Sequence, residues 1–136
     1  MLTTALLRDF SQFLDDESIA LASRYPEGID RLEQIFKKTF DIISAQGGDK
    51  VFKKWDQQRE EFRGSFLGTA FEAFALGVGY HISEEHPFRT DLLSAAKELW
   101  SRPEMQGGFA TGKSTERRLV EIVPIGRELL ASGGDA

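Results

Sequence analysis

A glycine-rich segment near the C-terminus has the spacing of a phosphate-binding loop. Residues 107–114 are Gly-Gly-Phe-Ala-Thr-Gly-Lys-Ser and match the pattern G-x-x-x-x-G-K-[ST]. In such a loop the backbone N–H groups surround the phosphates, the lysine contacts the outer phosphate oxygens, and the hydroxyl binds Mg²⁺. The candidate nucleotide-binding residues are therefore Gly107, Gly112, Lys113 and Ser114.

The surroundings of this segment do not favour a nucleotide site. A phosphate-binding loop follows a buried β-strand and opens a helix that packs on a parallel sheet. Residues 100–106 are instead polar and contain Pro103, and few residues follow Ser114 to complete a sheet. We expect a glycine-rich connection that leads into a capped helix, with nucleotide binding as an alternative.

Two histidines lie five residues apart, in the segment His81-Ile82-Ser83-Glu84-Glu85-His86. On a helix this separation turns the two side chains about 140° apart, so they would not share a face. A metal ion would also need a further ligand from elsewhere in the chain. We expect no metal and no other cofactor, with both histidines beside a surface turn and His81 against the helix end.

Paired carboxylates could carry out acid–base chemistry if they converged on one site. The pairs Glu60-Glu61 and Glu84-Glu85 do not converge on a helix, because adjacent residues point about 100° apart. Glu72 differs, because it lies in the most apolar segment of the chain, where a lone carboxylate would be costly. We expect Glu72 either to face water or to form a buried ion pair with an arginine.

Positive charge gathers in two parts of the sequence. The first group is Lys50, Lys53, Lys54 and Arg59, and the second is Lys113, Arg117, Arg118 and Arg127. If the two groups adjoined, they would form a basic surface for phosphates or for a protein partner. The formal net charge of −5 opposes strong nucleic-acid binding, which therefore stays an alternative.

Apolar residues at helical spacing predict the elements that position these groups. The clearest stripe predicts a helix over residues 27–46, between Pro26 and Gly47. Its apolar members are Ile29, Leu32, Ile35, Phe36, Phe40 and Ile43. Two shorter helices that divide at Asp15-Asp16 are expected to precede it as a helical hairpin.

The rest of the chain also favours helices, and no pair of β-strands is evident. Asp49 is expected to cap a helix that carries the Asp-Gln-Gln-Arg segment 56–59. Residues 66–80 are apolar around most of the helix circumference, which predicts a central buried helix. Another helix is expected before Pro103, and the last helical region should be kinked at Pro124 or divided there into two helices.

Length and composition predict one soluble, cytoplasmic domain. The chain has 136 residues, of which 40% are hydrophobic and 29% charged, and it has no cysteine. Acidic residues interrupt the N-terminal apolar stretch, and no segment has the ~20 apolar residues of a membrane span. We expect residues 1–132 to form an all-α, compact bundle of six or seven helices around one aromatic-rich core, with a frayed tail at 133–136.

From Arg63 onward the order of features resembles a known family. The stretches that carry the resemblance are 63–73 (RGSFLGTAFEA), 77–79 (GVG), Phe109, 112–115 (GKST), 117–119 (RRL) and 125–127 (IGR). Over about residues 50–130 the chain resembles the helical C-terminal part of bacterial proteins whose N-terminal domain has a ParB/sulfiredoxin-like fold. That family is associated with modification-dependent restriction of foreign DNA.

The resemblance implies a helical module without an active site of its own. In that family the chemistry resides in the N-terminal domain, which is marked by an Asp-Gly-Gln-Gln-Arg motif. Residues 56–59 lack the glycine of this motif and lie on a predicted helix, so no catalytic residue is carried over. Glu72 and Arg118 match the helical pattern, and their implied role is structural.

We therefore expect a non-enzymatic helical interaction or accessory module of a bacterial DNA-processing or phage-defence system. The alternatives are a nucleotide-binding protein or small enzyme that uses the 107–114 loop, and a nucleic-acid-binding helical protein. The eleven phenylalanines exceed the need of one small core. Some of Phe10, Phe13, Phe88 and Phe109 are expected to form an exposed patch for a protein partner or a second copy.

Overall fold

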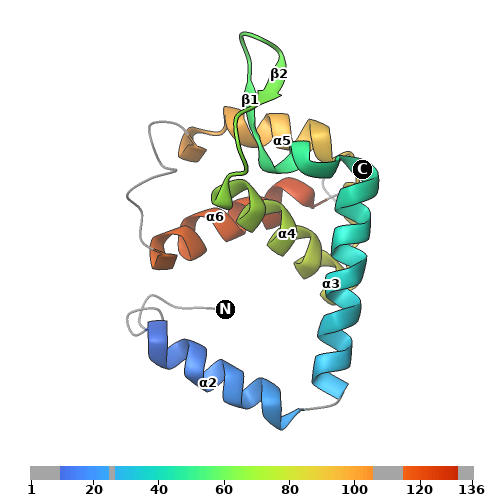
Figure 1. Cartoon of the computed structure of the whole chain (residues 1–136), viewed down its shortest axis with the longest axis vertical. Coiled ribbons are helices and arrows are strands. Elements are labelled where there is room, and N and C mark those ends of the chain that lie inside the picture. Colours follow the sequence, from blue (N-terminus) through green and yellow to red (C-terminus); the bar gives the residue numbers. More distant parts are fainter. Residues whose placement is uncertain (1–9, 25–26, 106–114, 132–136) are drawn as a thin grey trace.

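The computed structural model of the chain describes residues 10–24, 27–105 and 115–131, and these are mostly helical. Their five α-helices, numbered as in Figure 1, are α2 (Phe10–Ser23), α3 (Glu27–Gln46), α4 (Gly68–Ser83), α5 (Leu92–Ser101) and α6 (Thr115–Leu130). Two 3₁₀ helices, η1 (Gly48–Phe52) and η2 (Pro103–Met105), and two antiparallel strands, β1 (Lys54–Asp56) and β2 (Glu61–Arg63), complete the described elements. The predicted helical class is confirmed, but the described residues contain five α-helices and a hairpin rather than six or seven helices.

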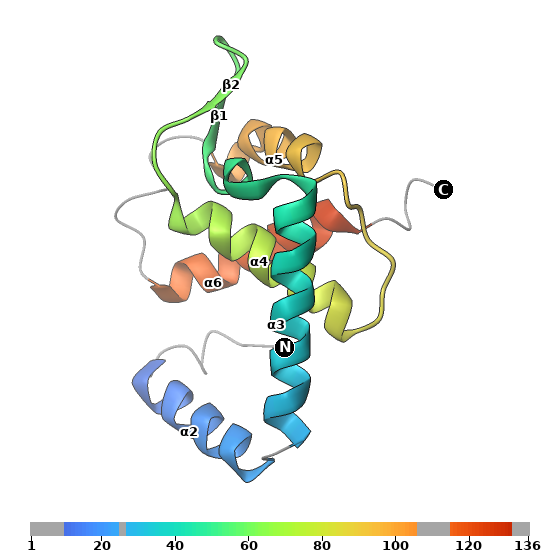
Figure 2. The same cartoon turned by 45° about the vertical axis from the view of Figure 1, so that its right-hand side comes forward.

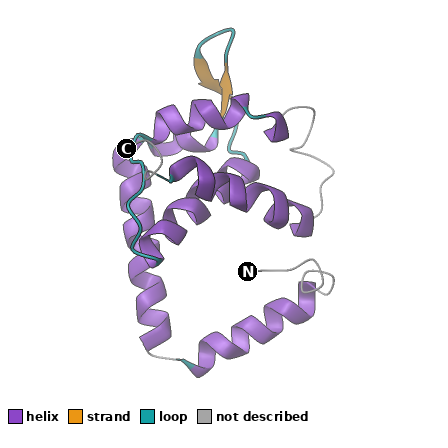
Figure 3. Cartoon of the chain, turned by 180° about the vertical axis from the view of Figure 1, so that it is seen from behind, coloured by secondary structure: helices purple, strands orange, loops and turns teal. Residues whose placement is uncertain are grey.

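Helix α4 lies at the centre of the arrangement. It packs most extensively on α6 and next most on α3, while α5 contacts α6 and η1. Figure 1 shows α3 as the long helix that connects this group to α2, which lies apart from α4 and α6. The hairpin projects beyond α5, as the view from behind in Figure 3 also shows. The predicted central position of the 66–80 segment is confirmed.

Helix α3 has the predicted bounds, residues 27–46, because both of its ends are encoded locally. Glu27 and Asp30 place negative charge in the first turn, where the helix dipole favours it. At the other end the N–H of Gly47 donates to the carbonyl of Ile43 at 3.0 Å, and Gly48 adopts a φ of +67°. Only glycine adopts this left-handed conformation at little cost, so the helix ends there.

The predicted helix after Asp49 is wrong, because residues 54–63 form a β-hairpin. The Oδ1 atom of Asp56 accepts hydrogen bonds from the N–H groups of Gln58 and Arg59 at 3.0 and 3.1 Å, and so fixes the turn. Trp55 and Phe62 are directly paired across the strands, with ring centroids 4.9 Å apart. The Asp-Gln-Gln-Arg segment therefore belongs to a strand end and a turn rather than to a helix.

The structure contradicts one further predicted helix break and excludes one of the two alternatives predicted at Pro124. Helix α2 continues through Asp15-Asp16, so no helical hairpin divides at that point. Helix α6 continues through Pro124, which excludes the alternative of two short helices. The predicted tail at 133–136 lies outside the described residues.

Helices α4 and α6 approach closely because small residues meet where they cross. A Cβ atom added at Gly126 would overlap the carbonyl oxygen of Ala73 and lie 2.7 Å from its carbonyl carbon. A Cβ atom added at Gly77 would lie 3.1 Å from the backbone of Gly126. The crossing therefore depends on glycine, since any side chain at position 126 would separate the two backbones.

The buried core is mainly aliphatic, which corrects the predicted aromatic-rich core. Phe74 and Trp100 are the aromatic residues among the buried hydrophobic residues described. The other large, fully buried side chains are Leu92, Leu99, Ile122, Leu130, Val51 and Val78. Most of the described phenylalanines instead form a half-exposed cluster, in which Phe71 contacts Phe40, Phe52 and Phe66 with ring centroids 5.4 to 6.0 Å apart.

Candidate functional site

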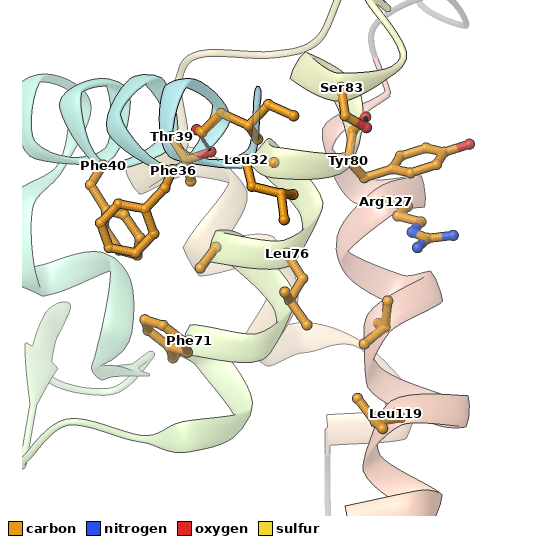
Figure 4. A pocket seen from close by; sticks show the side chains of 14 residues that line it. Leu32, Phe36, Thr39, Phe40, Phe71, Leu76, Tyr80, Ser83, Leu119 and Arg127 are labelled. Atoms are coloured by element: carbon orange, nitrogen blue, oxygen red, sulfur yellow. Dashed lines mark hydrogen bonds between the residues drawn. The ribbon is translucent and has the colours of Figure 1, made fainter. Parts of the chain in front are cut away.

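An apolar groove of about 640 Å³ lies along α3, α4 and α6. Figure 4 shows α4 in the middle of this groove, with side chains of α3 on one side and those of α6 on the other. The lining residues are Leu32, Ile35, Phe36, Thr39, Phe40, Phe71, Ala75, Leu76, Gly79, Tyr80, Ser83, Leu119, Val123 and Arg127. The apolar stripe of α3 and the apolar residues around α4 supply most of these side chains.

Three large apolar side chains of the groove face solvent. The exposed fractions are 46% for Leu32, 64% for Phe36 and 43% for Leu76. Leu32 and Phe36 lie four residues apart on α3 and therefore share one face of that helix. Contiguous exposed apolar surface of this kind, with a polar rim, marks binding surfaces in soluble proteins.

Two arginines lie at the end of the groove where α4 ends. The guanidinium carbon of Arg127 lies 4.0 Å from the centre of the Tyr80 ring, and Figure 4 shows the two side chains next to each other. Arg31 donates from Nη2 to the carbonyl of Ser83 at 2.8 Å, in the last turn of α4. Both positions suit a cation, because the ring face and the helix C-terminus carry partial negative charge. Two arginines therefore supply positive charge at this end of the groove.

The buried His81 joins α4 to the end of α6 behind the groove. Its Nε2 atom lies 2.9 Å from the carbonyl oxygen of Arg127. A carbonyl can only accept, so Nε2 carries the proton and donates. At the end of α6 the N–H of Ala131 donates to the carbonyl of Glu128 rather than to that of Arg127. The carbonyl of Arg127 therefore has no backbone donor from Ala131, and His81 supplies one. The histidine thus holds the arginine-bearing turn of α6 in place.

The two histidines meet because α4 ends between them, so the separation of about 140° on a continuous helix does not apply, and His81 is buried rather than at the surface. Helix α4 ends at Ser83, and Glu85 has a φ of +55°, so the chain turns back after the helix. The rings of His81 and His86 then lie with centroids 5.5 Å apart, and the N–H of His86 donates to the carbonyl of His81 at 2.9 Å. The described residues contain no group of three or more His, Cys, Asp or Glu side chains placed to hold a metal ion.

The segment after this turn is held by Arg89. Its N–H donates to the carbonyl of Leu130 at 2.9 Å, and its guanidinium binds both Asp91 and Glu98. The hydrogen bonds from Arg89 lower the pKa of Asp91 below its ordinary value. This anchoring positions Phe88, which stacks on His81 with ring centroids 5.9 Å apart.

Replacing His81 should weaken the end of α6. His81→Leu leaves the carbonyl of Arg127 without its donor, and we expect the free energy of unfolding to fall by about 2 kcal/mol. His81→Gln retains a side-chain N–H donor, and its loss should be clearly smaller. Urea unfolding of the two variants checks this, and equal losses would contradict the proposed role of the hydrogen bond.

The described members of the two predicted basic groups lie apart. Lys50, Lys53, Lys54 and Arg59 lie on η1 and the hairpin, and Lys53 pairs with Asp49 at 3.5 Å. Segment η1 packs at the start of α4, where the N–H of Leu67 donates to the carbonyl of Phe52. Arg127 instead lies over Tyr80, near the end of α4. The helical rise places these two ends roughly 20 Å apart. Arg117 and Arg118 belong to α6, but their side chains lie outside the described residues.

The other predicted site residues have different outcomes. Gly107, Gly112, Lys113 and Ser114 lie outside the described residues, so the structure places none of them. Glu72 lies on α4, is half-buried and interacts with other residues, and its buried ion pair stays a prediction.

The structure describes the side chain of one of the four phenylalanines expected in an exposed patch, and the patch itself stays a prediction. Phe88 is half-buried rather than exposed, and the side chains of Phe10, Phe13 and Phe109 lie outside the described residues. Among the phenylalanine side chains that the structure describes, Phe36 and Phe66 are the exposed ones. Phe36 lies on the apolar stripe of α3.

Comparisons with family models, curated proteins and solved structures give no match. The resemblance to the helical part of ParB/sulfiredoxin-like domain proteins therefore stays a prediction. Among the described helices, none combines the length and apolar character that a membrane span requires.

Proposed function

We propose that this protein is a non-enzymatic helical interaction module whose groove binds an amphipathic helix of a protein partner. The observation that carries the proposal is the joint exposure of Leu32, Phe36 and Leu76 along the groove. Burying a large apolar side chain contributes roughly 1.5–3 kcal/mol, so covering these three would be strongly favourable. An amphipathic helix suits this groove because its apolar side chains recur along one face, as in known helix-in-groove complexes.

The polar groups of the groove support a preference for acidic partners. Among the described residues that line the groove, Arg127 is the charged one, and Arg31 lies beside Ser83 at the same end. A partner helix with carboxylates next to its apolar face would meet these arginines with favourable charge. The apolar face would supply affinity, while the arginines would fix the orientation of the bound helix.

The setting of this module follows from the resemblance described above. The protein would act in the cytoplasm as an accessory part of a DNA-processing or phage-defence system, with the chemistry on its partner. Nucleotide binding through Lys113 and a basic surface for nucleic acid are the alternatives to this function.

A capture experiment with groove variants tests the proposal. Tagged wild-type protein and the variants Leu76→Lys and Val120→Lys are incubated with lysate of the source cell, with and without nuclease treatment, and bound proteins are identified by mass spectrometry. Val120 is a matched control, because it is an exposed apolar residue of α6 that does not line the groove. We expect a stoichiometric partner with wild type and Val120→Lys and its loss with Leu76→Lys.

Two outcomes would contradict the proposal that the groove binds a protein partner. Capture that Leu76→Lys leaves unchanged would place the binding surface elsewhere on the molecule. Capture that disappears with nuclease treatment would favour the nucleic-acid alternative, because protein contacts do not depend on intact nucleic acid.

A further inference from the structure

Helix α2 is exposed along most of its length. Every residue from Leu14 to Ala20 is exposed, including Leu14 at 47% and Ile19 at 69%. Figures 1 and 2 both show α2 apart from α4 and α6, with α3 as its neighbour. A helix of 14 residues is marginal in water without tertiary packing, so α2 requires cover that the described residues do not supply.

Hydrogen bonds connect the end of α2 to the start of α3. The N–H of Arg24 donates to Leu21 at 3.0 Å, and the N–H of Gly28 donates to Arg24 at 2.9 Å. A Cβ atom added at Gly28 would lie 2.8 Å from the Cβ of Arg24, so the close approach of these two residues requires glycine at position 28. Residues 14–20 of α2 stay exposed beside these contacts and are available to another molecule.

One face of α2 suits the groove. At about 100° per residue Ser18 lies beside Leu14 on an uncharged face, and Asp15 and Glu17 lie about 100° and 60° to either side of Leu14. The groove has apolar side chains on two sides, with Leu32 and Phe36 on α3 and Leu119 and Val123 on α6. A helix laid over α4 with Leu14 toward the groove would lie between these sides and complete a four-helix arrangement.

The charges are complementary as well. Helix α2 carries Asp15, Asp16 and Glu17, and all three are exposed. The groove ends beside Arg31 and Arg127. Opposite charges on the two surfaces would steer the helix to the groove and fix its direction.

We propose that the groove takes α2 of a second copy of this chain, and that two copies exchange their α2 helices reciprocally. The inference rests on the proposed function of the groove and names its occupant. Because each copy offers both a helix and a groove, one two-fold axis satisfies both contacts and the assembly closes as a dimer.

Light scattering of the full chain over a wide range of concentration tests the proposal. We expect wild-type protein to approach the mass of two chains. Leu14→Lys and Leu76→Lys, each at an exposed position, should each weaken the dimer about tenfold or more, because a lysine ammonium would be buried against apolar side chains. Val120→Lys, outside the groove, should dimerise as wild type does.

A mixture of the two weakened variants tests the reciprocal exchange. Leu14→Lys retains an intact groove and Leu76→Lys retains an intact α2, so the mixed dimer has one complete contact. We expect the mixture to associate more strongly than either variant alone. Absence of this recovery would overturn the exchange.

The outcomes also separate this inference from the proposed function. A monomeric wild-type chain at all concentrations would overturn the exchanged dimer, whether α2 then covers the groove of its own chain or leaves it open. If the capture experiment still gave a Leu76-dependent partner, the groove would keep its function with a different occupant. A dimer that both lysine variants leave unchanged would likewise overturn the inference.

Discussion

Replacing Gly126 with alanine is expected to lower the free energy of unfolding by about 3 kcal/mol, although alanine has the higher helix propensity. The added Cβ would overlap the carbonyl oxygen of Ala73, and that atom belongs to the backbone of α4. No rotamer change can relieve the overlap, so α4 and α6 must move apart. Urea unfolding monitored by circular dichroism measures the loss.

Gly68→Ala is the matched control, because it also places alanine in a described helix. No atom lies within 4 Å of a Cβ added at Gly68, so this change should leave stability the same or raise it slightly. A Gly126→Ala variant as stable as the control would contradict the close crossing of α4 and α6. The groove would then lose its geometric basis, since both helices line it.

Phe74→Ala is expected to lower the free energy of unfolding by about 4 kcal/mol, the largest effect for any phenylalanine described. Phe74 is fully buried between the central elements, and removing its ring leaves a cavity in a close-packed core. Thermal unfolding should show a large fall in the midpoint, or a chain that does not fold at the growth temperature.

Phe66→Ala provides the comparison for this prediction. Phe66 is exposed and contacts Phe52 and Phe71 at the edge of the aromatic cluster, so its loss should cost less than about 1.5 kcal/mol. Similar losses for the two variants would contradict the division between an aliphatic core and a half-exposed aromatic cluster.

The fold was predictable where its signals are local. The bounds of α3 follow from an apolar stripe, acidic residues in the first turn and glycines at the end, all within one segment. The hairpin was not predictable in this way, because apolar residues at 51, 52, 55 and 62 also fit a helix. The Asp56 turn supports the hairpin, and the ammonium of Lys97 lies 4.5 Å from the centre of the Trp55 ring. The second contact comes from α5, so the local sequence does not reveal it.

The groove could be predicted only in part. The surplus of phenylalanines in the chain indicated an exposed patch for a partner or a second copy, and that expectation pointed to Phe10, Phe13, Phe88 and Phe109. The groove instead combines Leu32, Leu76 and Leu119 from three helices that are distant in sequence. Such a surface depends on how helices cross, and the crossing depends on Gly126, whose importance emerges only when α4 lies against it.

Site-specific photocrosslinking from the groove tests the central claim most directly. The chain contains no cysteine, so Leu76→Cys carries a benzophenone at one defined position, and Val120→Cys carries it outside the groove. Both labelled proteins are irradiated in nuclease-treated lysate of the source cell, and the adducts are sequenced. We predict an adduct from position 76 to a helical segment of another polypeptide, with α2 of a second copy among the products, and little from position 120. No adduct at position 76, or equal yields at the two positions, would contradict the groove as the binding surface.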